Sequence, residues 1–146
     1  MNREEIMARI EATLGDRILE LDARSTRRAF VQVAPRDVAL VSRLMFETFG
    51  ARLQTATGID TPTSVELLYH WALDRLGYVI TIRIHLHREH PAIDSIAPLY
   101  PAAEWIEREI WELLGVEFRA HPDLRHLLLG DDWPQGKYPL RRDYEG

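Results

Sequence analysis

Two stretches near the N-terminus carry apolar residues at spacings of three and four, which is the period of an amphipathic helix. The first stretch covers residues 4–14 and stops at Gly15. The second covers residues 37–49 and stops at Gly50. Glycine is common directly after the last turn of a helix, because it adopts a left-handed conformation at little cost. The pattern therefore predicts one helix over each stretch.

A two-residue alternation of apolar and other residues marks the middle of the chain. It runs from Val65 to Trp71 and again from Tyr78 to Leu86, with a turn at residues 74–77 between the two segments. The two segments are therefore predicted to pair as an antiparallel hairpin. Shorter strands are expected at residues 18–21, 27–34 and 51–56, with Pro35 ending the second of them and a turn at residues 58–62.

The pattern changes after residue 90. Three prolines lie between residues 91 and 101, and Pro101 is well placed to begin a helix over residues 102–114 that ends at Gly115. Beyond it the sequence predicts one short helical turn at residues 124–128, then a segment rich in Gly, Pro, Asp and Arg. Such a segment buries little apolar surface by itself, so we expect it to lie against another surface.

Helices interleaved with strands, some of them joined by a short turn, indicate the fold class. We expect an α+β fold with a mainly antiparallel sheet, helices packed on one face and an extended C-terminal tail. The 146 residues match the roughly 100–200 residues that one core typically serves. The prediction is a single domain over residues 1–146, with a compact part at about 1–120 and a partner-binding tail at about 121–146.

Composition narrows the possible chemistry. The chain has no cysteine, and its 18 Lys+Arg against 23 Asp+Glu give a net charge of −5. Without cysteine this chain cannot perform thiol catalysis or hold thiolate zinc sites or all-cysteine iron–sulfur clusters. The negative charge disfavours non-specific binding of nucleic acid. No run approaches the about 20 apolar residues of a membrane-spanning helix, and the N-terminus lacks a signal-peptide pattern, so a soluble cytoplasmic chain is the expectation.

Few motifs indicate an active site. A Gly-x-Ser-x-Gly elbow and a glycine-rich phosphate loop are both missing. His85, His87 and His90 could share a metal ion, because imidazoles at this spacing on a strand can bind together. The competing interpretation is a solvated strand face, which Arg83 favours because it would repel a cation. A stand-alone metal-binding or ligand-binding domain stays open as an alternative, and a hydrolase using scattered carboxylates ranks below it.

The helix predicted over residues 102–114 can be projected at 100° per residue to find its docking face. The apolar arc consists of Ile106, Ile110, Leu113 and Leu114. Trp111 falls nearly opposite this arc, between Glu107 and Arg108, so we expect it to be exposed. It would serve either as a contact point for another protein or as a lid over the chain's own tail.

Two glutamates on this helix favour ion pairing over catalysis. Glu109 falls at the border of the apolar arc beside Trp105, where a carboxylate needs a basic partner. The later arginines that can supply one are Arg125, Arg141 and Arg142. Glu107 and Glu109 are two residues apart and point about 200° away from each other, so they cannot form a catalytic pair.

The same helix and the tail contain an ordered set of motifs. They are Glu107-Arg108-Glu109, Glu112-Leu113-Leu114, Gly115-Val116-Glu117-Phe118, His121-Pro122-Asp123-Leu124, Arg125 with Leu127-Leu128, and Pro139-Leu140-Arg141-Arg142-Asp143-Tyr144. Their order and spacing resemble the signature of the 30 kDa subunit, also called the C subunit, of respiratory complex I (NADH-quinone oxidoreductase). That family is also found in energy-converting membrane-bound hydrogenases. The first hundred residues are similar to it only in general pattern.

The resemblance implies a cofactor-free scaffold subunit, without an active site of its own, in a complex that couples electron transfer to ion translocation. Its main partner would be the large subunit related to nickel–iron hydrogenase large subunits, beside the quinone site, with other iron–sulfur subunits of the hydrophilic arm nearby. Iron–sulfur clusters, and a flavin or a nickel–iron centre, are expected in those partners. The chain would be peripheral on the cytoplasmic side of the cell membrane, reach the membrane only through the complex, and bind no nucleic acid. Quinone reductase and hydrogenase remain alternatives.

The resemblance also implies structural or subunit-interface roles for the motif residues, rather than catalytic, cofactor-binding or metal-binding ones. Glu107, Glu109 and the arginines are expected to form a buried or interfacial ion network that holds the tail. Trp111, His121 and Asp123 are expected to order that segment, with Asp123 capping the turn at residues 124–128. The full set is Glu107, Arg108, Glu109, Trp111, Glu112, His121, Asp123, Arg125, Pro139, Arg141, Arg142 and Asp143.

Overall fold

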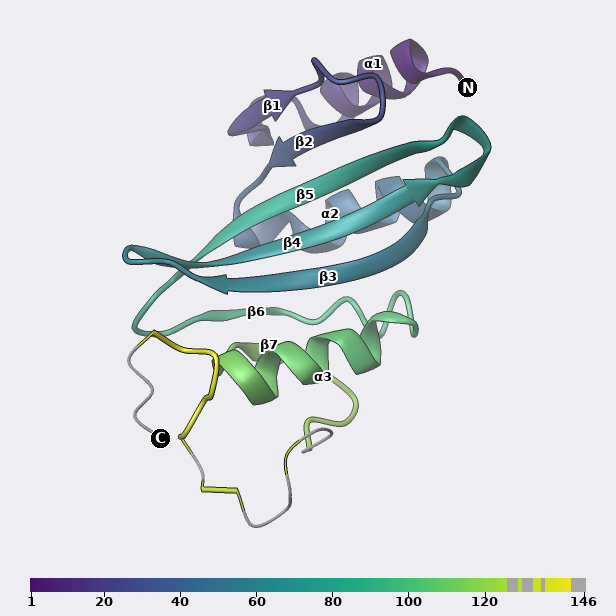
Figure 1. The fold of residues 1–146 in the computed structure, drawn as a ribbon. Coiled ribbons are helices and arrows are strands. Elements are labelled where there is room, and N and C mark those ends of the chain that lie inside the picture. Colours follow the sequence, from purple (N-terminus) through teal and green to yellow (C-terminus); the bar gives the residue numbers. More distant parts are fainter. Residues whose placement is uncertain (126–128, 130–132, 135, 143–146) are drawn as a thin grey trace.

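The computed structural model describes residues 1–125, 129, 133–134 and 136–142. Its centre is a five-stranded sheet with the strand order β1-β2-β5-β4-β3 (Figure 1). The strands of this sheet are β1 (Glu20–Asp22), β2 (Arg28–Gln32), β3 (Arg52–Asp60), β4 (Ser64–Leu73) and β5 (Tyr78–His87). A separate two-stranded sheet contains β6 (Ala92–Asp94) and β7 (Glu117–Arg119).

The predicted hairpin is the centre of the main sheet. β4 and β5 pair antiparallel along their whole length, from Ser64 opposite His87 to Leu73 opposite Tyr78. β3 pairs antiparallel with β4, and β1 with β2, whereas β2 pairs parallel with β5 and β6 parallel with β7. The sheet is thus mixed but mainly antiparallel, which confirms the predicted α+β class.

Three helices pack against this sheet. They are α1 (Arg3–Leu14), α2 (Val38–Arg43) and α3 (Ala103–Leu114). α2 does not remain α-helical to its expected end, because it passes into a π-helical turn at Leu44–Thr48, where the Phe49 N–H donates to Leu44 O at 3.2 Å. The three predicted helices are therefore confirmed, the second with a wider last turn.

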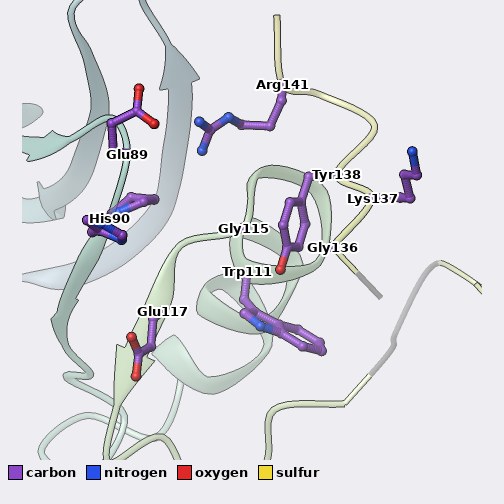
Figure 2. A pocket seen from close by; sticks show the side chains of 10 residues that line it. Glu89, His90, Trp111, Gly115, Glu117, Gly136, Lys137, Tyr138 and Arg141 are labelled. Atoms are coloured by element: carbon purple, nitrogen blue, oxygen red, sulfur yellow. The ribbon is translucent and has the colours of Figure 1, made fainter. Parts of the chain in front are cut away.

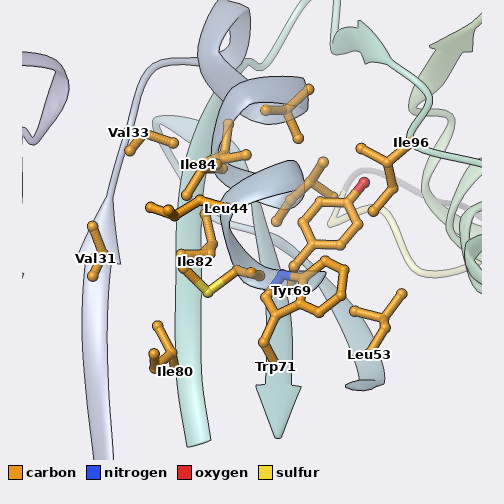
Figure 3. Close-up of a cluster of buried hydrophobic side chains, with 14 of the residues drawn as sticks. Val31, Val33, Leu44, Leu53, Tyr69, Trp71, Ile80, Ile82, Ile84 and Ile96 are labelled. Atoms are coloured by element: carbon orange, nitrogen blue, oxygen red, sulfur yellow. The ribbon is translucent and has the colours of Figure 1, made fainter. Parts of the chain in front are cut away.

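One face of the sheet forms the core. The apolar residues of the two alternating segments are buried there, and β2 extends the layer, since its register places Val31 beside Ile82 (Figure 3). Buried residues of all three helices belong to the same cluster. Complete burial of such side chains contributes about 1.5–3 kcal/mol each, so the helices are held mainly by this face.

The opposite face of the sheet carries the alternate residues. Arg83 forms an ion pair with Glu66 at 2.8 Å, and its guanidinium lies 5.2 Å from the centre of the Phe30 ring. His70 contacts Thr81 Oγ1 through Nδ1 at 2.9 Å. Burial and the nearby Arg28 charge lower the pKa of His70 below its ordinary value. An antiparallel sheet commonly presents one such polar face to water.

The turn expected at residues 58–62 is shorter than predicted. Residues 58–60 extend β3 instead, because Gly58 pairs with Leu67 and Asp60 with Val65 across β4. The chain turns just after Asp60, where Thr61 Oγ1 and the Ser64 backbone bond to each other.

The helical turn expected at residues 124–128 falls partly outside the described residues. Across the described ranges, none of the helices combines the length and apolarity that crossing a membrane requires.

Candidate functional site

α3 docks on the edge strand β3 at a position that has no side chain. Gly58 of β3 pairs with Leu67 of β4. A Cβ atom added to Gly58 would overlap Leu114 Cδ1 and would lie 3.1 Å from Ile110 Cγ2. Ile110 and Leu114 belong to the predicted apolar arc, and both are buried. The lack of a side chain at Gly58 therefore sets how closely α3, which carries the first motif, approaches the sheet.

Glu107, on the inner side of α3, is completely buried, with 0% of its surface exposed. Its Oε1 accepts a hydrogen bond from Ser95 Oγ at 2.6 Å, and its Oε2 accepts from Tyr69 OH at 2.9 Å and from the Ile96 N–H at 3.1 Å. None of the described cations forms an ion pair with it. The expected pairing of Glu107 with an arginine is therefore wrong, because neutral donors surround the carboxylate.

The environment of Glu107 changes the acidity of two groups. Burial raises the pKa of the Glu107 carboxyl above its ordinary value, although the three hydrogen bonds that it accepts act to lower it. Burial, followed by the Glu107 charge, raises the pKa of the Tyr69 hydroxyl well above its ordinary value. Both side chains are closed off from solvent, so neither can exchange a proton with a substrate. Together they join α3 to β4 and to the segment after β6.

The buried surface of α3 is wider than a single docking stripe, and this corrects two expectations. Glu109 is exposed rather than placed at a buried border, and Trp111 is half-buried rather than exposed. The exposed tryptophan is Trp105, with 61% of its surface accessible. The projection assumed one docking face, whereas α3 is covered both by the sheet and by the tail. Trp111 lies on the side toward the tail, as the predicted lid would (Figure 2).

Arg108 links α3 to the start of the tail. It is 4% exposed, and its Nη1 lies 3.2 Å from Asp123 Oδ2. The same oxygen pairs with Arg125 Nε at 2.9 Å. The Arg108 guanidinium also stacks 4.8 Å from the centre of the Trp105 ring, which holds that exposed side chain in place. Asp123 thus joins two arginines, and its proposed capping of a turn at residues 124–128 cannot be followed because residues 126–128 lie outside the described part.

His121 fixes the chain between α3 and Asp123. Its Nε2 lies 2.9 Å from Glu104 O, and its Nδ1 accepts from the Asp123 N–H at 2.9 Å. Only a neutral ring with its proton on Nε2 satisfies both contacts, and this tautomer is assigned from the bonding pattern. His121 therefore joins the carbonyl of Glu104 on α3 to the backbone of Asp123 at the beginning of the tail.

The C-terminal half of α3 binds the tail backbone at two points. Glu112 is buried, and its Oε1 accepts from the Leu129 N–H at 2.6 Å. Leu113 O accepts from the Leu140 N–H at 2.9 Å. The second contact uses one of the carbonyls that a helix end leaves without an intrahelical partner. The tail thus adds partners that α3 lacks by itself.

Asp60, at the end of β3, is the acidic anchor of the last described residues. Its Oδ2 accepts from Arg88 Nη2 at 3.0 Å and from the Arg142 N–H at 2.6 Å, and Arg141 Nε lies 3.6 Å away. The Asp60 side chain is only 1% exposed. Arg141 is held further by Leu114 O at 3.3 Å and Arg88 O at 3.0 Å. Removing one partner of such a buried group is costly, because the remaining charges lose their compensation.

Tyr138 closes the tail onto the end of α3. Gly115 has a φ of +79°, and a Cβ atom there would lie 2.6–3.0 Å from three atoms of the Tyr138 ring. Glycine is needed at this position both for the left-handed conformation and for the space that the ring occupies. The tail also bonds to itself, with Trp133 Nε1 donating to Lys137 O at 2.7 Å.

A cleft of about 670 Å³ lies between the β5–β6 connection, the end of α3 and the tail (Figure 2). Its walls include Glu89, Glu117, Trp111, Tyr138 and Arg141. The cleft combines two aromatic side chains with charged groups of both signs.

The three candidate metal-binding histidines do not gather into a site. His85 Nδ1 contacts Ser64 Oγ at 3.0 Å, whereas His87 Nδ1 accepts from the Glu89 N–H at 3.1 Å. His90 stacks on His87, with ring centres 6.1 Å apart. Within the described ranges, no group of three or more His, Cys, Asp or Glu residues is placed to hold a metal ion. The structure therefore gives no support to the alternative of a metal-binding domain.

The remaining motif residues belong to the tail. Pro139 is half-buried beside Tyr138, and Asp143 lies outside the described residues.

Sequence reasoning missed Asp60 and Arg88. A signal was available, because Val65 on β4 pairs with both Asp60 on β3 and Leu86 on β5. Correct strand boundaries would therefore have placed Asp60 and Arg88, two residues after Leu86, at the same end of the sheet.

Comparison with known proteins decides the family. The family described as respiratory-chain NADH dehydrogenase, 30 Kd subunit, matches residues 31–146. The chain belongs to this family. The resemblance that the motifs suggested is thereby confirmed. The match also includes the region before the motifs, where the sequence pattern alone was only general.

Several relatives of this 30 kDa subunit family member are known by sequence. The C subunit of the F(420)H(2) dehydrogenase of Methanosarcina mazei is 42% identical over 96 residues, which are 64% of this chain and 60% of the relative. The C subunit of the NADH-quinone oxidoreductase of Moorella thermoacetica is 35% identical over 118 residues, which are 80% and 78% of the two chains. A C/D subunit of the same kind of enzyme from Gluconacetobacter diazotrophicus is 35% identical over 112 residues, only 18% of its length.

Two solved structures share the fold of this family member. One is a chain of the membrane-bound sulfane sulfur reductase, an archaeal respiratory membrane complex. It has a TM-score of 0.85 and 26% identity, and the match covers 97% of this chain and 85% of that one. The other is a trypsin-resistant fragment of Nqo5, with a TM-score of 0.69 and 19% identity, covering 85% of this chain and all of the fragment. The second likeness concerns the fold alone.

Proposed function

We propose that this chain is a cofactor-free scaffold subunit in the hydrophilic arm of a complex I-type NADH-quinone oxidoreductase. The observation that carries the proposal is how the charged motif residues are used. Arg108, Glu112 and Asp123 bind this chain's own tail, and Glu107 is sealed inside the core. Residues committed to such contacts shape a surface for another subunit and leave no acid–base pair for a substrate.

The partner of this surface is the large subunit related to nickel–iron hydrogenase large subunits. One relative supports a neighbour of this kind, because the Gluconacetobacter protein, whose name joins the letters C and D, contains the matching region in 18% of a much longer chain. A C-type region and a D-type region that share one chain are kept near each other by their covalent connection. In this proposal the tail and the outer side of α3 face the large subunit, which itself lies next to the quinone site.

Trp105 is the contact point that the structure offers for this partner. The side chain is 61% exposed, and its stacking on Arg108 restricts its motion before any partner binds. Exposed tryptophans with a fixed conformation are typical of the residues that dominate binding at protein interfaces. The exposed tryptophan of α3 thus takes the place first expected for Trp111.

An alternative is the equivalent subunit of another membrane complex, including an energy-converting nickel–iron hydrogenase. The likeness to the sulfane sulfur reductase chain, which covers nearly all of this chain, supports keeping this alternative beside the assignment to NADH and quinone. The F(420)H(2) dehydrogenase relative points in the same direction. In either complex the scaffold role, the peripheral position on the cytoplasmic side of the membrane and the electron carriers of the partner subunits would be the same.

Co-purification from the native membranes tests the proposal. A tag on Met1 avoids the tail, because Met1 and the tail lie at opposite ends of the molecule (Figure 1). We expect the tagged chain to retain a hydrogenase-type large subunit, identified by mass spectrometry, and iron–sulfur subunits. Retention of an NADH-binding flavoprotein would favour complex I, whereas a large subunit with four metal-binding cysteines would favour the hydrogenase. A chain that never retains a large subunit would contradict the scaffold role.

A matched pair of variants locates the contact surface in the same experiment. Trp105→Ala should weaken retention by at least about tenfold if the tryptophan is a dominant contact. Leu19→Ala removes a side chain of similar exposure, 59% against 61%, from the N-terminal part, and should leave retention unchanged. Equal effects of the two substitutions would show that the surface around Trp105 is not the one that meets the partner.

A further inference from the structure

We propose that the cleft between the β5–β6 connection, the C-terminal end of α3 and the tail binds a cationic side chain, an arginine or a lysine, carried by the large subunit. The identity of that partner rests on the proposed function, whereas the chemistry of the cleft does not. Three separate features of the cleft select a positive charge: its aromatic walls, its free carboxylates and the helix end that opens into it.

The aromatic walls come from two elements. Trp111 projects from the last turns of α3, and Tyr138 comes from the tail that folds over Gly115 (Figure 2). The faces of indole and phenol rings carry negative electrostatic potential, and a guanidinium or ammonium group within about 6 Å of a ring centre is attracted to it. Arginine in particular stacks on such rings while its N–H groups remain available for bonding.

The free carboxylates are Glu89, in the β5–β6 connection, and Glu117, at the start of β7. Both are exposed, and neither forms an ion pair with any described cation. Within the described residues, the basic side chains that line the cleft form no ion pair with either glutamate. Arg141 is bound to Asp60 and to two backbone carbonyls, and Lys137 extends from the far side of the tail in Figure 2. Two carboxylates therefore remain for an incoming cation.

The end of α3 adds a third negative contribution. Gly115 closes the helix with its N–H bonded to Trp111 O, and both residues line the cleft. The C-terminal end of a helix carries the equivalent of about half a negative charge, which favours nearby cations. Arg141, bonded to Leu114 O, offsets part of this charge. α3 has 12 residues, long enough for its peptide dipoles to add along more than three turns.

Other classes of ligand fit the cleft less well. An anion would meet two carboxylates and the negative end of a helix, whereas the Arg141 guanidinium of the lining is already bound to Asp60 and two carbonyls. A metal ion would not be held here, because the described residues form no group of three or more His, Cys, Asp or Glu side chains placed to bind one. Small apolar ligands prefer pockets lined mainly by hydrophobic side chains, whereas charged residues make up much of this lining. A cationic protein side chain satisfies the aromatic and the acidic walls together.

The cleft exists because the tail is bound to α3 and to the end of β3. Tyr138 forms one wall, and the tail holds this position through Leu140 bonded to Leu113 and through the anchor at Asp60. The aromatic wall is therefore positioned before a partner arrives, which reduces the entropy lost on binding.

Titration with a defined probe tests the chemistry directly. The probe is the capped peptide acetyl-Gly-Arg-Gly-amide, added to the full ¹⁵N-labelled chain, with the citrulline peptide as an uncharged control of the same shape. We expect the Trp111 indole resonance to shift on addition of the arginine peptide only. The double variant Glu89→Gln/Glu117→Gln should weaken this binding by about fivefold or more. The matched control Glu4→Gln/Glu11→Gln, at two exposed positions of α1, should bind as the unmodified chain does.

The outcomes separate this inference from the proposed function. Equal binding of the citrulline peptide, or no shift at Trp111 with the arginine peptide at tens of millimolar, overturns the cationic cleft. If the tagged chain retains the large subunit but the Glu89→Gln/Glu117→Gln chain retains it equally, the cleft is wrong and the scaffold role stands. If no large subunit is retained while the arginine peptide binds as expected, the proposed partner is wrong and the chemistry of the cleft stands.

Discussion

Glu107→Gln is the substitution that most directly tests how α3 is held. The carboxylate accepts from two donors on Oε2, Tyr69 OH and the Ile96 N–H, and from Ser95 on Oε1. A glutamine keeps the shape but replaces one acceptor oxygen by an NH₂ group. If that group faces the Ile96 N–H, two donors meet. If it faces Ser95, the hydroxyl must turn away and loses its acceptor.

The cost follows from this mismatch. A buried donor left without an acceptor costs about 1–3 kcal/mol. Part of this is offset, because the amide no longer buries a charge that the protein interior disfavours. We therefore expect the free energy of unfolding to fall by about 1–2 kcal/mol near neutral pH. This is a substantial share of the about 5–15 kcal/mol that stabilises a typical domain.

The same substitution has a pH dependence of known sign. Burial raises the folded-state pKa of Glu107 above the ordinary 4.5, so the folded state holds the proton more tightly than the unfolded state does. The stability from this group is complete below about pH 4.5 and decreases as the pH rises through the raised pKa. Glutamine does not titrate. The cost of Glu107→Gln should therefore be larger near pH 4 than near pH 7.

Urea unfolding followed by circular dichroism measures these differences. With an m-value of about 2 kcal/mol/M, the midpoint near pH 7 should fall by roughly 0.5–1 M. Glu109→Gln is the matched control, since it makes the same change two residues away at an exposed position and should cost less than about 0.5 kcal/mol. Equal costs for the two variants, or a cost of Glu107→Gln that grows from pH 4 to pH 7, would refute the reasoning.

Two further predictions concern the tail. Asp60→Asn removes the charge that holds Arg88 and the Arg142 backbone, so trypsin should cleave the tail about tenfold faster or more, while Asp94→Asn, in an exposed ion pair, should not change the rate. Gly115→Ala adds a Cβ against the Tyr138 ring as well as strain from the positive φ. It should cost more than the about 1 kcal/mol expected for Gly77→Ala, whose φ is also positive but whose Cβ meets no atom within 4 Å. Equal denaturation midpoints for the two glycine variants would argue against the ring contact.

The central hairpin and the three helices could be predicted because their signals are local. The alternation over residues 65–71 and 78–86 and the helical spacing before Gly15 depend only on each segment burying one face. The parallel pairing of β2 with β5 could not be predicted in this way. It depends on how the chain crosses over between distant elements, which periodicity does not record.

Prediction of the candidate site was limited in a similar way, because the sequence does not show which faces of α3 are buried. The motifs identified α3 and the tail as the important region, but the projection of α3 exchanged the roles of Glu107 and Glu109, and of Trp105 and Trp111. A helical projection assumes one buried side, and here the tail creates a second one. Asp60 was missed for a related reason, because its partners come from the ends of β5 and the tail and meet only in three dimensions.

The parallel contact between β2 and β5 has a consequence for how the molecule assembles. β3, β4 and β5 follow one another through short turns, so they can pair with little loss of chain entropy. β2 can pair with β5 only after β5 is in place, because α2, β3 and β4 lie between them in the sequence. Long-range pairings of this kind form late and slow the folding of a domain. We therefore expect strands β3, β4 and β5 to pair first and to offer the edge on which β2 docks later.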